Sequence, residues 1–207
     1  MSVRVKICGL TSVEDALAAV EAGADALGFM FYEASPRHVS AKLVAEIVRR
    51  LPPFVAKVGV FVDAAEAAVR QAMSDCGLDT LQFHGSESPE FCARFSSIKV
   101  YKAFRVRGLE SLADLPRFST DAWLLDSYVP DKPGGTGAQF NWDLAVEAKK
   151  FGRPIILAGG LTPENVGDAV QRVQPYAVDV SSGVESAAGK KDHGKVRRFI
   201  AAACETL

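Results

Sequence analysis

Short runs of apolar and β-branched residues alternate along the chain with longer, alanine-rich amphipathic stretches. The apolar runs have the length of buried strands, and the amphipathic stretches have the spacing of helices that cover a sheet. We expect strands at residues 3–7, 25–31, 54–62, 80–83, 98–104, 122–125, 154–157 and 177–180. We expect helices at residues 13–22, 41–51, 64–76, 89–95, 109–115, 142–150, 163–173 and 195–204, with caps at Ser12, Asp63, Ser88 and Thr162.

The number and order of these elements predict the fold class. Eight strand-helix units in 207 residues are typical of a single small (β/α)8 TIM barrel, an α/β fold in which parallel strands close into a ring. An open doubly wound sheet is the alternative, but it does not need eight evenly spaced units, and no GxGxxG turn follows the first strand. No linker or change of composition divides the chain, so we expect one barrel domain over residues 1–207.

The near-zero net charge of the chain indicates which kinds of binding partner to expect. Lysine and arginine number 24 against 25 aspartate and glutamate residues, a formal net charge of −1, so electrostatics gives no reason to expect nucleic acid or an anionic membrane surface. No apolar stretch approaches the roughly 20 residues of a membrane span, and the first residues lack the apolar core of a signal peptide. We expect a cytoplasmic monomer or homodimer that binds a small molecule.

The four cysteines show no metal-binding or disulfide spacing. Cys76, Cys92 and Cys204 lie in predicted helices, where a reduced cysteine usually acts as a small buried hydrophobe. Cys8 differs, because it ends the first predicted strand. We expect neither a metal nor a cofactor.

Active sites of this fold lie at the carboxyl ends of the strands, which gives Cys8 and Asp126 a functional interpretation. Asp126 follows the apolar strand 122–125, where partial desolvation would raise its pKa and suit it to act as a general acid. Cys8 could complement it as a general base, because the first and sixth strands are three steps apart in a ring of eight. A capping role for Asp126 and a structural role for Cys8 are the alternatives.

Two turns of small residues follow the seventh and eighth predicted strands. Gly159 and Gly160 form one, and Ser181, Ser182 and Gly183 form the other. Such turns expose backbone N–H groups at the positions where barrels of this kind often bind phosphate, so we expect a phosphorylated ligand. Glycines that merely permit tight turns are the alternative.

Three further polar residues lie near strand ends. Arg37 follows Pro36 and suits a planar carboxylate bound by two parallel hydrogen bonds, although a plain surface arginine is the alternative. Gln82 and His84 end the fourth strand. We interpret His84 as a polar lining residue, since no second histidine or acidic cluster accompanies it as a metal site would require.

The alternation of side chains along residues 3–7 points Lys6 to the same side as Cys8. Its neighbours across the closing seam of a barrel would come from the eighth strand, where Asp179 has the opposite charge. We hypothesise a buried Lys6–Asp179 pair beneath Cys8 whose positive charge favours the ionised thiol.

The most irregular connection, residues 127–140, follows the sixth strand and contains Pro130, Pro133 and several glycines. This composition fits a mobile loop over the barrel mouth and, equally, an ordinary surface loop.

Seven segments spread along the chain resemble phosphoribosylanthranilate isomerase of tryptophan biosynthesis. They are KICGLT (6–11), SPRHV (35–39), VGVF (58–61), QFHG (82–85), KPGGTG (132–137), LAGGL (157–161) and DVSSGVE (179–185). The resemblance implies an Amadori rearrangement of N-(5-phosphoribosyl)anthranilate without a cofactor. It makes Cys8 the general base and Asp126 the general acid, places Arg37 against the anthranilate carboxylate, and assigns Gly160, Ser182 and Gly183 to the phosphate-binding turns.

Two other functions compete with this one. A related barrel isomerase of histidine biosynthesis performs the same type of rearrangement, but its family carries an aspartate in place of Cys8 and acts on a substrate with two phosphates. The first half of this chain shows no second glycine-rich turn for another phosphate. A barrel that only binds a phosphorylated metabolite is the non-catalytic alternative, and it predicts that Cys8→Ala and Asp126→Asn leave biological activity intact.

Overall fold

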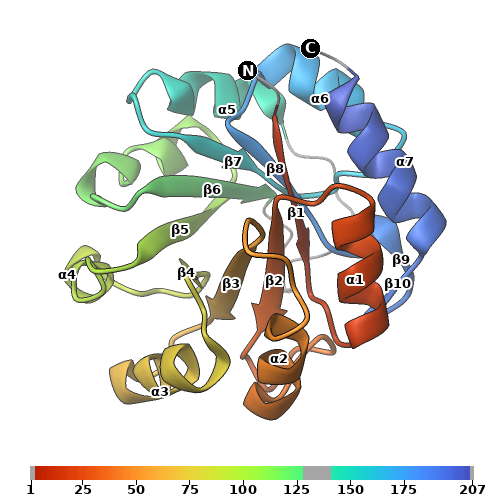
Figure 1. Ribbon diagram of the computed structural model, residues 1–207. Helices are drawn as coiled ribbons and strands as arrows, with labels where there is room; N and C mark the ends of the chain where they lie inside the picture. Colours follow the sequence, from red (N-terminus) through yellow and green to blue (C-terminus); the bar gives the residue numbers. More distant parts are fainter. Residues whose placement is uncertain (1–2, 128–140, 206–207) are drawn as a thin grey trace.

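Eight parallel strands close into a barrel whose order in the ring is the order in the sequence, as predicted (Figure 1). The computed structural model describes residues 3–127 and 141–205, so the predicted loop 127–140 lies almost entirely outside the described residues. The ring closes where the first strand pairs with the last, with Lys6 in register with Asp179. The strands are β1 Arg4–Cys8, β2 Ala26–Met30, β3 Ala56–Phe61, β4 Thr80–Phe83, β5 Lys99–Val106, β6 Ala122–Ser127, β7 Ile155–Leu157 and β8 Ala177–Val180.

Helices surround the barrel on its outside (Figure 1). They are α1 Val13–Glu21, α2 Ala41–Val48, α3 Glu66–Cys76, α4 Pro89–Ala93, α5 Trp142–Lys149, α6 Val166–Val173 and α7 His193–Cys204. Ser12 and Ser88 cap α1 and α4 as predicted, because each hydroxyl accepts a backbone N–H of the first turn. None of the described helices is long and apolar enough to cross a membrane.

Several predicted helix boundaries were wrong. Asp63 does not cap α3, because its carboxylate accepts the backbone N–H of Ser86 instead. Thr162 precedes a turn over residues 163–165, and α6 begins only at Val166. The helix expected at residues 109–115 is replaced by the two 3-10 turns η1 Leu109–Leu112 and η2 Leu115–Arg117. Pro116 lies at the start of η2, where its missing N–H donor costs no hydrogen bond.

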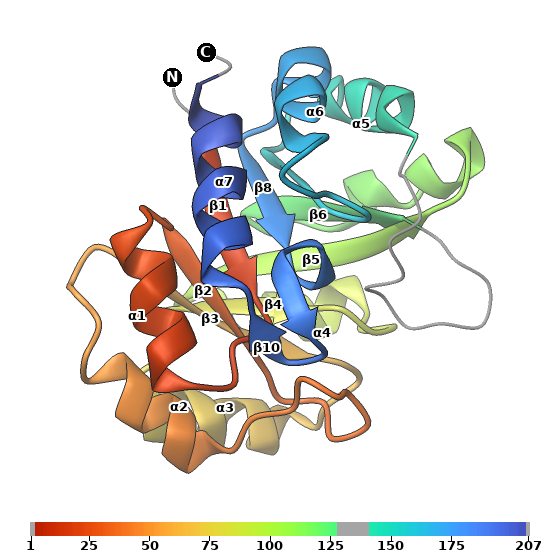
Figure 2. The ribbon, with the colours of Figure 1, turned by 90° about the vertical axis from the view of Figure 1, so that its right-hand side faces the viewer.

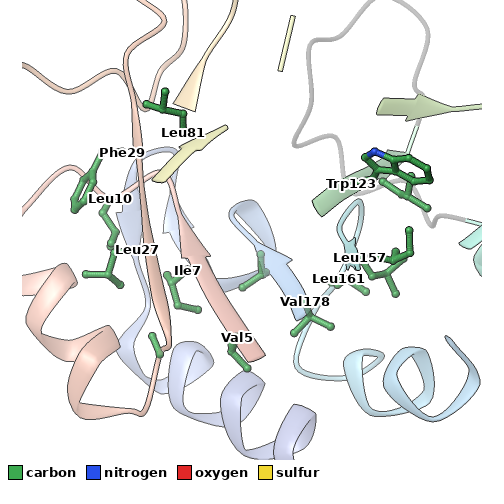
Figure 3. Close-up of a cluster of buried hydrophobic side chains, with 14 of the residues drawn as sticks. Val5, Ile7, Leu10, Leu27, Phe29, Leu81, Trp123, Leu157, Leu161 and Val178 are labelled. Carbon is green, nitrogen blue, oxygen red and sulfur yellow. The ribbon is translucent and has the colours of Figure 1, made fainter. Parts of the chain in front are cut away.

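Apolar side chains pack in two layers on either side of the strands. The outer layer, between strands and helices, contains Val5, Ile7 and Trp123 and is the larger of the two (Figure 3). The inner layer fills the barrel and consists of Ala103, Ala122, Leu124, Ile156, Ala158 and Ala177. Because side chains alternate along a strand, Val5 and Ile7 face the helices while Lys6 lies inside. Polar groups of β1 are thereby directed into the barrel.

A short antiparallel hairpin follows β8 and was not predicted. The 3-10 turn η3 Ser182–Val184 leads into β9 Glu185–Ala187, which pairs with β10 Lys190–Lys191. Gly189 between them has a φ of +78°, a backbone conformation that favours glycine. Figure 2 shows the hairpin at the end of the barrel opposite the two chain termini. It therefore lies at the carboxyl ends of the strands.

Candidate active site

One pocket opens at the carboxyl ends of the strands and is lined by all ten residues predicted for the site. They are Cys8, Arg37, Gln82, His84, Asp126, Gly159, Gly160, Ser181, Ser182 and Gly183. Cys8 ends β1 and Asp126 lies near the end of β6, three positions away around the ring. Tyr32 and Arg105 also line the pocket and were not predicted. Arg105 pairs in register with Asp126, and this strand pairing was the signal that could have revealed it.

The Cys8 side chain is buried against polar and small neighbours. A Cβ atom at Gly28 would lie 2.6 Å from Cys8 Sγ and 3.1 Å from Lys6 Nζ, so the absence of a side chain on β2 makes room for both groups. Beneath the thiol, Lys6 Nζ donates to Asp179 Oδ1 over 2.8 Å. The two side chains are only 3% and 9% exposed, which confirms the predicted buried pair.

The predicted effect of this pair on the thiol was only partly right. Burial raises the pKa of the Cys8 thiol, and the nearby Asp179 carboxylate raises it further, whereas the Lys6 ammonium lowers it. The net direction is upward, so the free site favours the protonated thiol. Burial also lowers the pKa of Lys6, but the charges of and hydrogen bonds to Asp179 and Cys8 together outweigh this, and the net direction is again upward. Lys6 assists ionisation of the thiol without overcoming its burial.

Asp126 of β6 lies in a polar group with Gln82 of β4 and His84, which directly follows β4. The carboxyl group is buried, with the residue 5% exposed, and its Oδ2 lies 3.4 Å from Nε2 of His84. Nδ1 of that ring lies 3.0 Å from the amide nitrogen of Gln82. The amide nitrogen can only donate, so this contact makes Nδ1 the acceptor and assigns the proton of a neutral ring to Nε2. His84 thus directs an N–H group toward the Asp126 carboxyl group.

Two buried polar atoms in this group have no hydrogen-bond partner among the described residues. They are His84 Nε2 and Gln82 Oε1. Unpaired buried polar atoms are costly in a folded protein and commonly mark positions that a ligand or water completes. The arrangement is therefore consistent with the lining role expected for Gln82 and His84.

The glycine turns after β7 and β8 border the same pocket. Gly159 and Gly160 have φ values of +82° and +69°, which L side chains rarely adopt. Gly183 packs its α-carbon against the backbone carbonyl of Leu161, so a side chain there would collide with the neighbouring turn. Ser181 Oγ is buried beside these turns and lacks a partner among the described residues. This part of the pocket, formed by Gly159, Gly160 and residues 181–183, has the small residues and the unpaired hydroxyl typical of an anion site. We call it the anion corner.

Arg37 already binds a carboxylate, which the sequence analysis did not anticipate. Its Nε and Nη2 atoms donate to the two carboxylate oxygens of Glu185, each over 2.8 Å. The stem of the side chain crosses Gly9, where a Cβ atom would lie 2.6 Å from Arg37 Cδ. Gly9 therefore permits Arg37 to lie next to the Cys8 strand end. No hydrophobic or charge pattern in the sequence signalled Glu185 as its partner.

The cysteines outside the pocket are only partly as predicted. Cys76 and Cys92 are buried, as expected of small apolar side chains. Cys204 is exposed, because it lies near the end of α7 on the side away from the barrel core. Among residues 3–127 and 141–205, no group of three or more histidine, cysteine or acidic side chains is placed to hold a metal.

A closed α/β barrel with a thiol, a carboxyl group and an anion corner in one pocket defines a barrel enzyme that acts on a small molecule. The family model of N-(5'-phosphoribosyl)anthranilate isomerase matches residues 5–202. The chain is also 58% identical over 200 residues to the N-(5'-phosphoribosyl)anthranilate isomerase of Geobacter sp. strain M21, covering 97% of each protein. This chain belongs to the N-(5'-phosphoribosyl)anthranilate isomerase family.

Two solved structures extend the comparison. One is of a phosphoribosyl anthranilate isomerase in complex with reduced 1-(o-carboxyphenylamino)-1-deoxyribulose 5-phosphate, with a TM-score of 0.88, 41% identity and coverage of 99% of this chain and all of that one. The other shows monomers generated from the dimeric isomerase of Thermotoga maritima, with a TM-score of 0.89, 40% identity and the same coverage. Both agree with the barrel described above.

Proposed function

We propose that this protein isomerises N-(5'-phosphoribosyl)anthranilate to 1-(2-carboxyphenylamino)-1-deoxyribulose 5-phosphate, a step of tryptophan biosynthesis. Membership of the isomerase family over residues 5–202 carries this proposal. The placement of Cys8 and Asp126 in one pocket supports it, because the reaction needs an acid and a base on either side of one sugar. The chain would act as one catalytic domain in the cytoplasm, as a monomer or homodimer.

Cys8 and Asp126 divide the proton transfers of this rearrangement. Asp126 gives its proton to the ring oxygen of the ribose, the bond from that oxygen to C1 breaks, and the anthranilate nitrogen forms a Schiff base with C1. Cys8, as the thiolate, then takes the proton from C2, and the electron pair of that bond neutralises the Schiff base to give an enolamine. Tautomerisation of the enolamine gives the ketose product. No electron transfer is required, so the residues of the pocket suffice.

The remaining residues bind and orient the substrate. The anion corner formed by Gly159, Gly160 and Ser181–Gly183 takes the phosphate, with Ser181 Oγ as a side-chain donor. Arg37 takes the carboxylate of the anthranilate ring. Gln82 and His84 contact the part of the substrate nearest Asp126, where their unpaired atoms lie.

The acid-base assignment is tested by a steady-state assay with freshly made phosphoribosylanthranilate that follows loss of the anthranilate fluorophore. Removing a positioned general acid or base typically costs about 10²- to 10⁴-fold, so we expect losses of this size in kcat for Cys8→Ala and Asp126→Asn. Cys76→Ala and Asp143→Asn are matched controls outside the pocket and keep the wild-type rate. Equal rates in Cys8→Ala, Asp126→Asn and wild type would defeat the assignment.

A further inference from the structure

Glu185 is placed between two cations at the edge of the pocket. Its carboxylate accepts two hydrogen bonds from Arg37 and one of 2.8 Å from Lys191 Nζ. The three side chains are 15%, 5% and 0% exposed for Arg37, Glu185 and Lys191 respectively. Two of these residues come from the hairpin that follows β8, and the third comes from the segment after β2. We call them the Arg37–Glu185–Lys191 cluster.

The hairpin end of this cluster is held in place by several contacts. Lys191 Nζ also donates to the backbone carbonyl of Ser181 over 3.2 Å, and the Lys191 backbone N–H donates to Asp15 of α1 over 2.9 Å. Lys195 Nζ donates to the backbone carbonyl of Glu185 over 2.9 Å. These contacts fix the position of Glu185. Its two hydrogen bonds in turn hold the longer and more exposed Arg37 side chain.

The contact with Glu185 leaves one edge of the Arg37 guanidinium available for a ligand. A guanidinium carries five N–H donors, and Glu185 takes the side edge formed by Nε and Nη2. The end edge, made of Nη1 and the second N–H of Nη2, has two parallel donors that can bind another carboxylate. Arg37 lines the pocket, and its stem is confined by its close contact with Gly9.

The charges of the cluster suit an anionic ligand. Burial alone would raise the pKa of Glu185, but the hydrogen bonds from Arg37 and the charge of Lys191 outweigh it and lower the pKa. Burial lowers the pKa of Lys191, and the charge of Glu185 opposes this shift. With Lys191 protonated, an ionised Glu185 between two cations leaves a net charge of +1. Without Lys191, the Arg37–Glu185 pair would be neutral and would attract a ligand carboxylate less.

We propose that Glu185 is a positioning residue that holds Arg37 with its end edge toward the pocket, and that Lys191 keeps this pair net positive, so that together they select a substrate with a ring carboxylate. The proposal rests on the proposed function, which assigns the anthranilate carboxylate to Arg37. It adds two residues of the β9–β10 hairpin that do not contact the substrate and act through Arg37.

The test compares two stable ligands by calorimetry. One is reduced 1-(o-carboxyphenylamino)-1-deoxyribulose 5-phosphate, and the other is the same compound without the ring carboxylate. The dissociation constant of the ligand without the carboxylate, divided by that of the ligand with it, measures recognition of the carboxylate alone. A lower ratio means weaker recognition. It is determined for wild type, Glu185→Gln, Lys191→Met and Arg37→Met, with Lys190→Met, an exposed neighbour in β10, as the matched control.

We expect Lys191→Met to lower this ratio about tenfold, the size typical of a weakened charged hydrogen bond, while binding of the ligand without the carboxylate changes less than about twofold. Glu185→Gln adds one unit of net positive charge but releases the guanidinium from its fixed orientation. We expect the lost alignment of the two parallel hydrogen bonds to outweigh the added charge, so the ratio falls about tenfold here too. Arg37→Met abolishes the preference, and adding Glu185→Gln to it has no further effect. Lys190→Met leaves the ratio unchanged. Lys191→Met keeps the test informative if Glu185→Gln does not fold.

Two results would overturn the inference. An unchanged or increased ratio in Glu185→Gln would show that Arg37 needs no positioning, and an equal loss of affinity for both ligands would show that Glu185 only supports the fold. Failure of the proposed function looks different, because wild type would then neither turn over phosphoribosylanthranilate nor bind the reduced product.

Discussion

The Cys8 thiol is subject to opposing influences from its neighbours. Burial and Asp179 raise its pKa, whereas Lys6 lowers it, and the net direction is upward. A thiol acts as a base only in its ionised form. If Cys8 is the base, the fraction of active enzyme therefore rises as the pH increases from neutrality toward the pKa of the thiol.

This behaviour gives a prediction for pH dependence. In wild type, kcat/KM increases with pH above neutrality, because that parameter reports the ionisation of the free enzyme. Lys6→Met removes the charge that lowers the thiol pKa, so it moves the rise to higher pH. Lys6→Met with Asp179→Asn moves it less, because the carboxylate that raises the pKa is removed as well. Lys42→Met, on the exposed surface of α2, serves as the control, and a Lys6→Met profile identical to wild type would refute the argument.

At the scale of single residues, most of the site followed from the sequence. Cys8, Asp126 and the glycine turns end or follow strands, and in a closed barrel all strand ends meet at one rim, so their shared pocket could be expected. The Lys6–Asp179 pair followed from side-chain alternation and closure of the ring. Glu185 could not be predicted in this way, because its contact with Arg37 depends on a hairpin that local patterns did not indicate.

At the scale of elements, β2 and β3 each contain a glycine where a neighbouring side chain approaches the backbone. Gly28 of β2 faces the inside of the barrel and lies against Cys8 and Lys6. Gly59 of β3 faces the outer layer, where a Cβ atom would lie 2.6 Å from Leu78 Cδ1. The two positions can be compared directly. Alanine at Gly28 disturbs the pocket, whereas alanine at Gly59 disturbs only the packing of the outer layer.

We predict that alanine lowers kcat at one of these positions and the free energy of unfolding at the other. Gly28→Ala displaces the thiol, and because a misplacement of about 1 Å can cost roughly 10²-fold, kcat falls by about that factor. Gly59→Ala crowds the outer layer and lowers the free energy of unfolding by about 1–3 kcal/mol, while kcat stays near the wild-type value. Kinetics and urea denaturation of both variants check this. A similar loss of kcat in the two variants would contradict the assigned role of Gly28.

The elements also show where sequence reasoning failed. The alternation of strands and helices was regular enough to predict all eight strands of the ring. The helix at residues 109–115 was predicted from apolar spacing, but this segment forms the separate 3-10 turns η1 and η2. The β9–β10 hairpin was missed because three and two residues are too few to show a period of two.

At the scale of the whole molecule, the Lys6–Asp179 pair joins the first and last strands of the ring. Removing one member of a buried ion pair leaves an uncompensated charge in the interior. We predict that Lys6→Met and Asp179→Leu each lower the free energy of unfolding by about 3–5 kcal/mol, whereas the double variant is closer to wild type than either. Denaturation of wild type, the two single variants and the double variant gives the coupling free energy between the two positions.

The Lys99–Asp121 ion pair serves as an exposed control for the buried Lys6–Asp179 pair. It has the same 2.8 Å separation but lies on the surface, with side chains 70% and 38% exposed. Exposed pairs contribute at most about 1 kcal/mol, so Lys99→Met has a small effect. Equal effects of Lys99→Met and Lys6→Met on the free energy of unfolding would show that burial of the seam pair does not matter.

Closure of the ring by its first and last strands also affects how the protein is made. Lys6 and Asp179 are separated by 173 positions, so β1 leaves the ribosome long before its partner strand is translated. Until then β1 is an unpaired edge to which another nascent chain can add, and contacts this distant in sequence form slowly. The turn at residues 181–183 is translated after β8. The pocket is therefore completed only once β8 and this turn have been made, and ribosomes that stop before β8 release chains that can neither close the barrel nor form the turn proposed to bind phosphate.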